Sequence, residues 1–427
     1  MSTPNFKRTK FACYSAYFTM SSIFCVPPLL FVTFQQLYDV SYTLLGTLVL
    51  VNFCTQLGID LIFTLFSKFF NPKMLVRVMP ILTALGMFLF ALIPTLFESY
   101  AYLGFLIGTI IFSVSAGLSE VLLSPTIAAI PSDNPQRDMS FLHSLYAFGT
   151  FTMIIFSTLF LKVFHAENWA YLMMFLGCLP IIAAVLFMLS PMPDMQGDNS
   201  TATSVKNGKK RALGLSLCFA CIFFGACVEC AMSTWISTYM ENALGIDKAL
   251  GDILGVAAFA ILLGLARIAY ARFGKNIGKT LLISMCGGAI CYLVAGLSPN
   301  TIVCFIACCM TGFCSAMLWP GSLILMEEKV PNAGVAAFAL MAAGGDLGAS
   351  VAPQLTGVVV DQVAVSSFGN KLATKWNITS EQVGLKIGML LNAVFALCGV
   401  ITVLIIIRYF KKRKTAENKV ELAQQNH

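Results

Sequence analysis

Most of this chain consists of apolar runs of about 20 residues, separated by short polar breaks. An α-helix of that length spans the hydrocarbon core of a bilayer, whereas a spanning strand needs only about ten residues of alternating polarity. We count twelve runs, and each predicts one membrane-spanning helix. They cover residues 11–34, 42–66, 75–96, 100–130, 139–162, 169–190, 212–240, 250–272, 279–297, 300–326, 334–361 and 383–408.

Lysine and arginine residues gather in alternate breaks, and this asymmetry predicts how the chain is oriented in the membrane. If the N-terminus is cytoplasmic, 22 of the 27 basic residues fall in cytoplasmic segments. The other five are Lys162, Lys248, Lys371, Lys375 and Lys386. An even number of spans places both termini on one side. We therefore expect a multi-pass protein of the cytoplasmic (inner) membrane with both termini in the cytoplasm.

The longest polar break, residues 191–211, separates six runs from six and is rich in Pro, Gly, Ser, Thr and Lys. Such a composition is typical of a linker. The sequence thus predicts four parts. They are an N-terminal half at 1–190, a cytoplasmic linker at 191–211, a C-terminal half at 212–410 and a cytoplasmic tail at 411–427.

The two predicted halves share a motif in the same order. The fourth run carries GLSEVLLSP from Gly117, and the tenth carries GFCSAMLWP from Gly312. A second proline follows each motif, Pro131 in the first half and Pro331 in the second. The shared order indicates an internal duplication, and two six-helix repeats are the organisation of major facilitator transporters.

The chain resembles the major facilitator superfamily over essentially its whole length. LHSLYAFG at 142–149, WISTYMENALGI at 235–246, and LWPGS with GGDLGASVAP at 318–322 and 344–353 resemble the fucose–proton symporter-like branch, among bacterial members of unassigned substrate. The superfamily signature after the second run is degraded at Phe66–Lys73, whereas ARFGK at 271–275 is closer to it. The resemblance implies an all-α membrane fold of twelve helices in two six-helix repeats. It also implies that runs 1, 4, 7 and 10 line a central cavity, with runs 2, 5, 8 and 11 beside them.

Composition supports a membrane protein and excludes several other classes. Hydrophobic residues make up 58% of the chain and charged residues 11%, against about 25% charged in soluble domains. The net charge of +7 does not indicate a nucleic-acid partner, because the basic residues lie in the breaks. Cys227 and Cys230 lack the second Cys or His pair of a metal site. We expect no metal, no cofactor and no enzyme activity, since no H-E-x-x-H, G-x-S-x-G or P-loop element is present.

Ionisable residues inside the apolar runs are the candidate functional residues, because each costs at least ~2.5 kcal/mol at the centre of a span. The runs that the resemblance assigns to outer support contain none of them between residues 79–97, 170–190, 280–297 and 387–407. The buried candidates fall instead on runs beside the cavity, at Asp60, Glu120, His143, Glu229, Arg267 and Asp346.

Glu120 and His143 flank the polar break at 131–138 on adjacent predicted helices and at similar depth. They form our leading proton site, because an imidazole titrates near neutral pH and a carboxylate partner shifts its titration. A structural hydrogen bond between them is the alternative. Asp60, Arg267 and Asp346 complete the predicted proton-coupling or gating residues.

Glu229 is predicted to bind substrate, whereas Arg267 could instead extend to the membrane interface. The two residues differ in depth by roughly 9 Å at ~1.5 Å per residue. A direct salt bridge between them is therefore possible but not favoured.

The other predicted substrate-binding residues are amides and aromatic residues. Asn52 and Gln56 lie on one face of the second run, where amides bind hydroxyl groups but also join helices. The aromatic candidates are Tyr146, Trp235, Tyr239 and Trp319, and an interfacial belt or plain packing is the alternative for them.

These features predict a secondary active transporter that moves a small polar organic solute, with a sugar favoured, by proton-coupled alternating access. An alternative is transport or export of amphipathic compounds such as drugs or steroid-like acids, which a cavity lined mainly by Phe and Met would favour. A membrane enzyme or transport-dead receptor is an alternative of another class. The expected partners are the solute, protons and lipid, and the expected state is a monomer.

Overall fold

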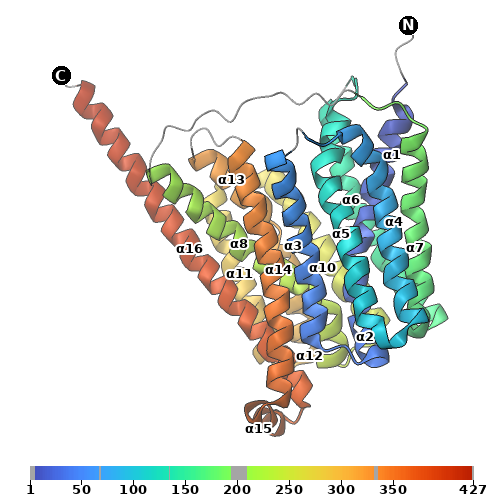
Figure 1. Cartoon of the computed structure of the whole chain (residues 1–427). Coiled ribbons are helices and arrows are strands. Elements are labelled where there is room, and N and C mark those ends of the chain that lie inside the picture. The colour runs from blue at the N-terminus through green and yellow to red at the C-terminus, as the bar shows by residue number, and fades with distance from the viewer. Residues whose placement is uncertain (1–4, 67–68, 134, 194–208, 331–334, 426–427) are drawn as a thin grey trace.

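The computed structural model describes residues 5–66, 69–133, 135–193, 209–330 and 335–425 (Figure 1). Most of the predicted linker at 191–211 lies outside these ranges. Within them the chain is almost entirely helical and contains no strand. The predicted all-α membrane fold is therefore confirmed.

The N-terminal half contains seven α-helices in its described part. They are α1 (Lys7–Leu29), α2 (Phe31–Tyr38), α3 (Tyr42–Phe66), α4 (Pro72–Leu96), α5 (Ala101–Ala128), α6 (Pro135–Phe164) and α7 (Trp169–Met188). Helix α4 shows why a helix begins where it does, since Asn71 caps it and Pro72 occupies its first position. The short 3₁₀ turns η2 (Glu98–Tyr100) and η3 (Ala166–Asn168) precede α5 and α7.

The C-terminal half contains α8 (Lys209–Thr238), α9 (Lys248–Leu250), α10 (Ala257–Phe273), α11 (Ile277–Leu297), α12 (Thr301–Ser315), α13 (Leu318–Lys329), α14 (Val335–Val365), α15 (Ser367–Trp376) and α16 (Ser380–Gln425). Two π-helical segments, η4 (Tyr239–Ala243) and η5 (Gly251–Val256), flank the turn between α8 and α10. Helix α16 continues past residue 411, so the predicted tail does not begin at a helix end.

Each of the twelve predicted runs coincides with a helix or with a broken pair of helices. Nine described helices are long and apolar enough to cross a membrane, and a tenth span results if α1 and α2, bent by 51°, count as one. The bend follows Pro27 and Pro28, which cannot donate backbone hydrogen bonds. Helices α6 and α14 have 30 and 31 residues. The count of twelve spans stays a prediction.

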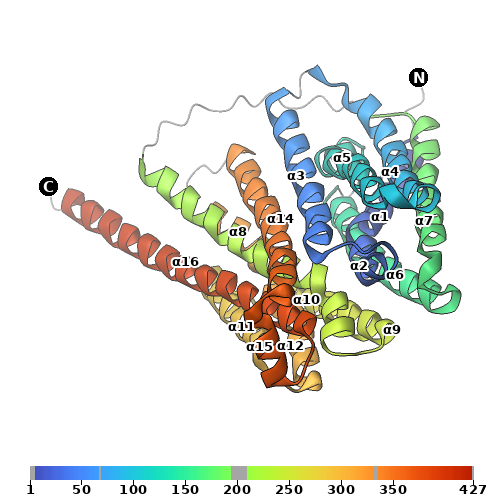
Figure 2. The same cartoon turned by 60° about the horizontal axis from the view of Figure 1, so that its bottom comes forward.

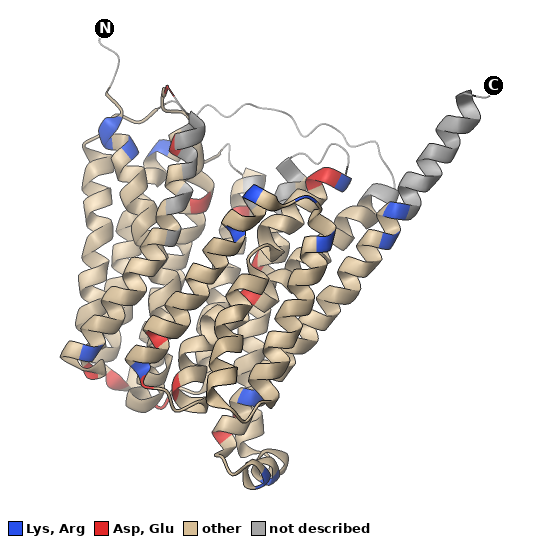
Figure 3. Cartoon of the chain, turned by 180° about the vertical axis from the view of Figure 1, so that it is seen from behind, with Lys and Arg blue, Asp and Glu red and all other residues tan. Residues whose placement is uncertain are grey.

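The two halves stand side by side, with both chain ends on the same side (Figure 1). Most Lys and Arg residues also gather on that side (Figure 3). We call it the terminal side and the opposite end the far side. Helices α3 and α14 pack together along the boundary between the halves (Figure 2). On the far side the rings of Phe34, Phe105 and Trp169 pack within 4.2–5.6 Å of one another and hold the first half together.

Gly357 allows the close approach of α14 to α3. A Cβ atom at this position would lie 2.2 Å from the carbonyl oxygen of Tyr42. Small residues at such crossings let helix backbones pack directly in membrane proteins. The close contact between α14 and α3 therefore requires a residue without a side chain at position 357.

We expect Gly357→Val to lower the stability of the protein by about 1–3 kcal/mol, because the added atoms force α14 away from α3. Thermal unfolding in detergent measures the change. Gly58→Ala is the matched control on α3, since a Cβ there meets no atom within 4 Å. An unchanged melting temperature for Gly357→Val would show that the close approach of α14 to α3 does not contribute to stability.

Candidate functional site

A cavity of about 550 Å³ lies between the two halves. Its lining comes from α1, α2, α3, α5 and α6 of the first half and from α8, η5 and α10 of the second. Most of the lining is apolar, and its aromatic members are Phe24, Phe31, Phe53, Phe112, Tyr146, Phe148, Phe151 and Phe259. The resemblance implied that the tenth run also lines the cavity, but the lining includes no residue of α12 or α13.

The polar part of the lining contains hydroxyl groups, one amide and one pair of opposite charges. Its members are Asn52, Thr109, Thr150, Glu229, Ser233, Thr234, Ser237 and Arg267. The cavity therefore has a large apolar surface and a limited number of polar positions, as is usual for sites that bind small organic molecules.

Asn52 reaches the cavity and also joins two helices. Its Oδ1 atom accepts hydrogen bonds from Gln56 Nε2 and from Ser113 Oγ on α5, each at 2.8 Å. Gln56 is buried and is not part of the lining. Of the two predicted amides, Asn52 thus faces the cavity while Gln56 orients it.

Glu229 on α8 and Arg267 on α10 face each other in the lining of the cavity. Arg267 Nη2 lies 3.4 Å from Glu229 Oε1, and Arg267 Nε donates to the carbonyl of Ala316 at 3.0 Å. The ion pair that the sequence left possible but did not favour is therefore formed, because the long arginine side chain covers the difference in depth. Glu229 Oε2 is buried without a hydrogen-bond partner in the described structure.

Three carboxyl groups lie close together on the terminal side of the cavity. Glu120 on α5 is within electrostatic reach of Asp60 on α3 and of Asp346 on α14, which belongs to the other half. Glu120 is exposed, whereas Asp346 is buried. We call these three residues the carboxylate cluster. His143 is on α6, but its side chain lies outside the described part of the structure.

The predicted aromatic residues separate into two groups. Tyr146 lines the cavity, with its ring 6.2 Å from Tyr17 and 6.0 Å from Phe24. Trp235 and Tyr239 are fully buried outside the lining. The indole N–H of Trp235 donates to the carbonyl of Pro353 at 3.0 Å, and the Tyr239 hydroxyl donates to that of Ala295 at 2.5 Å.

Trp319 also lies outside the lining, and its ring covers Gly345, where a Cβ would come within 2.4 Å of the indole. None of the described tryptophans lines this cavity, so the predicted substrate-binding residues Trp235 and Trp319 do not face it.

We expect Trp235→Phe to destabilise the protein by about 1–3 kcal/mol, because the buried hydrogen bond from the indole to the Pro353 carbonyl is lost and the smaller ring leaves a cavity. The KM for transported solute should stay unchanged, because Trp235 does not reach the cavity. Thermal unfolding and concentration-dependent uptake by the same variant measure the two effects. A large rise in KM at unchanged stability would show instead that Trp235 contributes to the substrate site.

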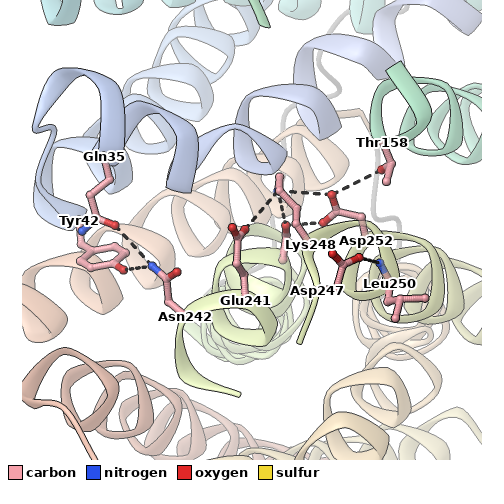
Figure 4. A network of polar contacts seen from close by, with 10 residues as sticks. Gln35, Tyr42, Thr158, Glu241, Asn242, Asp247, Lys248, Leu250 and Asp252 are labelled. Atoms are coloured by element: carbon pink, nitrogen blue, oxygen red, sulfur yellow. Dashed lines mark hydrogen bonds and ion pairs between the residues drawn. The ribbon is translucent and has the colours of Figure 1, made fainter. Parts of the chain in front are cut away.

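Sequence reasoning missed a group of polar contacts that closes the far side. The Asp361 carboxylate on α14 accepts hydrogen bonds from the backbone N–H groups of Tyr42, at 3.1 Å, and Thr43, at 2.6 Å. It therefore caps the N-terminus of α3, a helix of the other half. The Tyr42 hydroxyl accepts a hydrogen bond from Asn242 Nδ2 at 2.7 Å (Figure 4). The same hydroxyl donates to Glu381.

A second set of far-side contacts surrounds Asp252, which is 1% exposed (Figure 4). Lys248 Nζ lies 3.3 Å from its carboxylate, and Ser237 donates to the same group. Thr158 of the first half donates to it at 3.4 Å. We call both sets the far-side gate. Its residues lie at the ends of apolar runs, where charged groups resemble ordinary interfacial residues, so no pattern distinguished them.

The gate defines the conformation. Hydrogen bonds between the halves gather on the far side, while Glu120 on the terminal side is exposed and Arg267 has a side chain 44% exposed. The cavity is closed toward the far side and reached from the terminal side.

The sequence profile of the Major Facilitator Superfamily matches residues 11–353, and the chain therefore belongs to this superfamily of membrane transporters. None of the curated protein sequences matches the chain significantly.

Solved structures of this fold resemble the chain along nearly its whole length. A bacterial homologue of the human lysosomal transporter Spinster, inward-facing and unoccupied, has a TM-score of 0.73 at 11% identity, covering 96% of this chain and 98% of that one. A D-xylose–proton symporter has a TM-score of 0.71 at 14% identity, covering 91% and 96%. The fucose:proton symporter of E. coli has a TM-score of 0.56 at 16% identity, covering 94% and 99%. At these identities the similarity shows the fold alone.

Proposed function

We propose that the chain is a proton-coupled secondary transporter that moves a small amphipathic organic solute across the cytoplasmic membrane by alternating access. The observation that carries this proposal is a cavity between the two halves that is closed on one side and reached from the other. The terminal side is the cytoplasmic side because it carries most of the basic residues. The conformation is then inward-facing, and the protein acts as a monomer.

The composition of the lining supports an amphipathic solute over the sugar that the sequence favoured. Seven phenylalanine rings bind apolar groups, whereas a sugar needs many hydrogen-bonding partners to replace its water shell. A sugar is the second candidate, because Asn52, Thr109 and Ser233 offer such partners in the lining. The D-xylose and fucose symporters among the structural neighbours agree with that second candidate.

The carboxylate cluster supports proton coupling. Neighbouring carboxylates repel one another in a site of low polarity, and binding a proton relieves the repulsion. Because Asp346 belongs to one half and Asp60 and Glu120 to the other, protonation changes how favourably the halves approach on the cytoplasmic side.

Uptake into proteoliposomes tests this function. Purified protein should accumulate an amphipathic solute when a pH gradient is imposed and should equilibrate it without one. Sugars and amphipathic compounds are compared in the same assay. If no solute responded to the gradient, proton coupling would be wrong, and if none entered at all, the transport proposal would fail.

We expect His143→Ala to abolish or strongly alter the pH dependence of transport while leaving expression intact, since the imidazole titrates in this range. Initial uptake rates between pH 5 and 8 measure the effect. His165, at the far end of the same half after α6, provides a control, and His165→Ala should keep the wild-type profile. A wild-type pH profile in His143→Ala would leave the residue with a structural role.

A further inference from the structure

We propose that the solute is a zwitterion with an apolar body, of the kind of an α-amino acid, held by Glu229 and Arg267. This inference rests on the proposed transport function and adds the class of solute. It follows from the only ion pair in the described lining and from the apolar surface around it.

The ion pair is loose and incompletely satisfied. Its N–O distance of 3.4 Å exceeds the ~2.7–2.9 Å of a strong charge-assisted hydrogen bond. One carboxylate oxygen of Glu229 has no partner. A buried oxygen without a donor is costly, so a ligand that supplies an ammonium group gains energy there. The terminal torsion of a glutamate is broad, which lets either oxygen turn toward the cavity.

Arg267 is held in place yet remains available to a ligand. The hydrogen bond from Nε to Ala316 fixes the side chain against the junction of α12 and α13. The guanidinium group keeps further N–H donors, and its side chain is 44% exposed. A guanidinium group binds a carboxylate in a two-point arrangement that a point charge cannot reproduce.

The spacing of the two charges selects the solute. Two adjacent opposite charges on the protein match two adjacent opposite charges on the ligand. In an α-amino acid the ammonium nitrogen and carboxylate carbon are about 2.5 Å apart, because both are bonded to one carbon. The solute's ammonium then faces Glu229 and its carboxylate faces Arg267.

Charge balance and shape agree with this arrangement. The cavity has no net charge from the pair when empty, and a zwitterion leaves that balance unchanged, which avoids moving an unpaired charge through a site of low polarity. The phenylalanine rings of the lining then surround the apolar side chain of the solute.

A matched set of probes tests the inference by calorimetric binding to the purified protein. L-phenylalanine carries both charges, L-phenylalaninamide lacks the carboxylate and 3-phenylpropionate lacks the ammonium group. We expect phenylalanine to bind at least about tenfold more tightly than either analogue, as one lost hydrogen bond to a charged group predicts.

Two variants act as controls for each other. Arg267→Gln should remove the preference for phenylalanine over its amide while keeping the preference over 3-phenylpropionate. Glu229→Gln should remove the preference over 3-phenylpropionate while keeping the preference over the amide. If Arg267→Gln is unstable, Arg267→Lys tests the same point, because it keeps the long side chain and the positive charge but not the two-point guanidinium, and it should weaken the first preference selectively.

Equal binding of the three probes, no binding of phenylalanine, or loss of both preferences in either variant would overturn the inference. Failure of the transport function is distinguishable from these outcomes. If the gradient drives uptake of an uncharged amphipathic solute but not of phenylalanine, the proposed transport function stands and the inference of a zwitterionic solute is wrong.

Discussion

Glu120→Gln is expected to abolish solute accumulation driven by a pH gradient while leaving exchange of solute across the membrane intact. Glutamine keeps the shape of the side chain but cannot bind and release a proton. A gradient of two pH units stores about 2.7 kcal/mol per proton, enough for roughly hundredfold accumulation. The variant should lose that accumulation and reach only equal concentrations on both sides.

The structural reason lies in the position of Glu120. Its side chain is exposed on the terminal side and interacts electrostatically with a carboxyl group of each half, Asp60 and Asp346. A proton can reach it from water, and its charge is felt by both halves. Gradient-driven uptake and counterflow in proteoliposomes measure the two activities separately.

Glu328→Gln is the matched control for this experiment. Glu328 is an exposed carboxylate on α13, also on the terminal side, and it pairs with its neighbour Lys329 at 2.8 Å. Its loss should leave accumulation unchanged. Wild-type accumulation in Glu120→Gln would remove Glu120 from the coupling mechanism, and loss of exchange as well would indicate a structural role.

Asp361→Ala is expected to open the far-side gate and to shift the protein toward an outward-facing state. The substitution removes two hydrogen bonds across the halves and a negative charge at the N-terminus of α3. Hydrogen bonds to a charged group and the helix-terminus effect together are worth about 2–5 kcal/mol. That energy changes the ratio of the two states by roughly thirtyfold or more.

Distances between spin labels at Tyr100 and Val365, on opposite halves of the far side, measure this shift. Both side chains are exposed. The labels should be carried by non-natural amino acids, because the chain has fifteen cysteines. A population with longer distances is expected in the Asp361→Ala variant.

Asp247→Ala provides a control for Asp361→Ala, because Asp247 caps α9 at 3.2 Å within its own half. It should leave the distance distribution unchanged. An unchanged distribution in Asp361→Ala would mean that the remaining gate contacts, around Tyr42 and Asp252, suffice to keep the far side closed.

Several residues show how far sequence reasoning reached in the candidate site. Glu229, Tyr146 and Asn52 were predicted to face a cavity, and the structure places them in its lining. Ionisable residues in apolar runs are costly, so their presence already restricts where they can lie. Their binding roles stay predictions.

Other residues were placed differently because their position depends on packing between segments distant in sequence. The indole of Trp235 meets Pro353, 118 residues away, and leaves the cavity. Asp346 approaches Glu120 from the other half. Asp361 caps α3 across 319 residues of chain. Periodicity along one helix contains no information on such encounters.

The sequence by itself determined that the chain is a helical membrane protein, and its division into two related halves is a prediction from the same sequence. In lipid every backbone N–H and C=O group must be hydrogen-bonded within its own segment or within a closed barrel. Apolar runs of about 20 residues therefore form α-helices. The tertiary structure alone decided which side chains meet, where the cavity lies and which side is closed. The physical reason is that the rotation, tilt and spacing of each helix are set by its contacts with other helices, at positions such as Gly357 and Arg267.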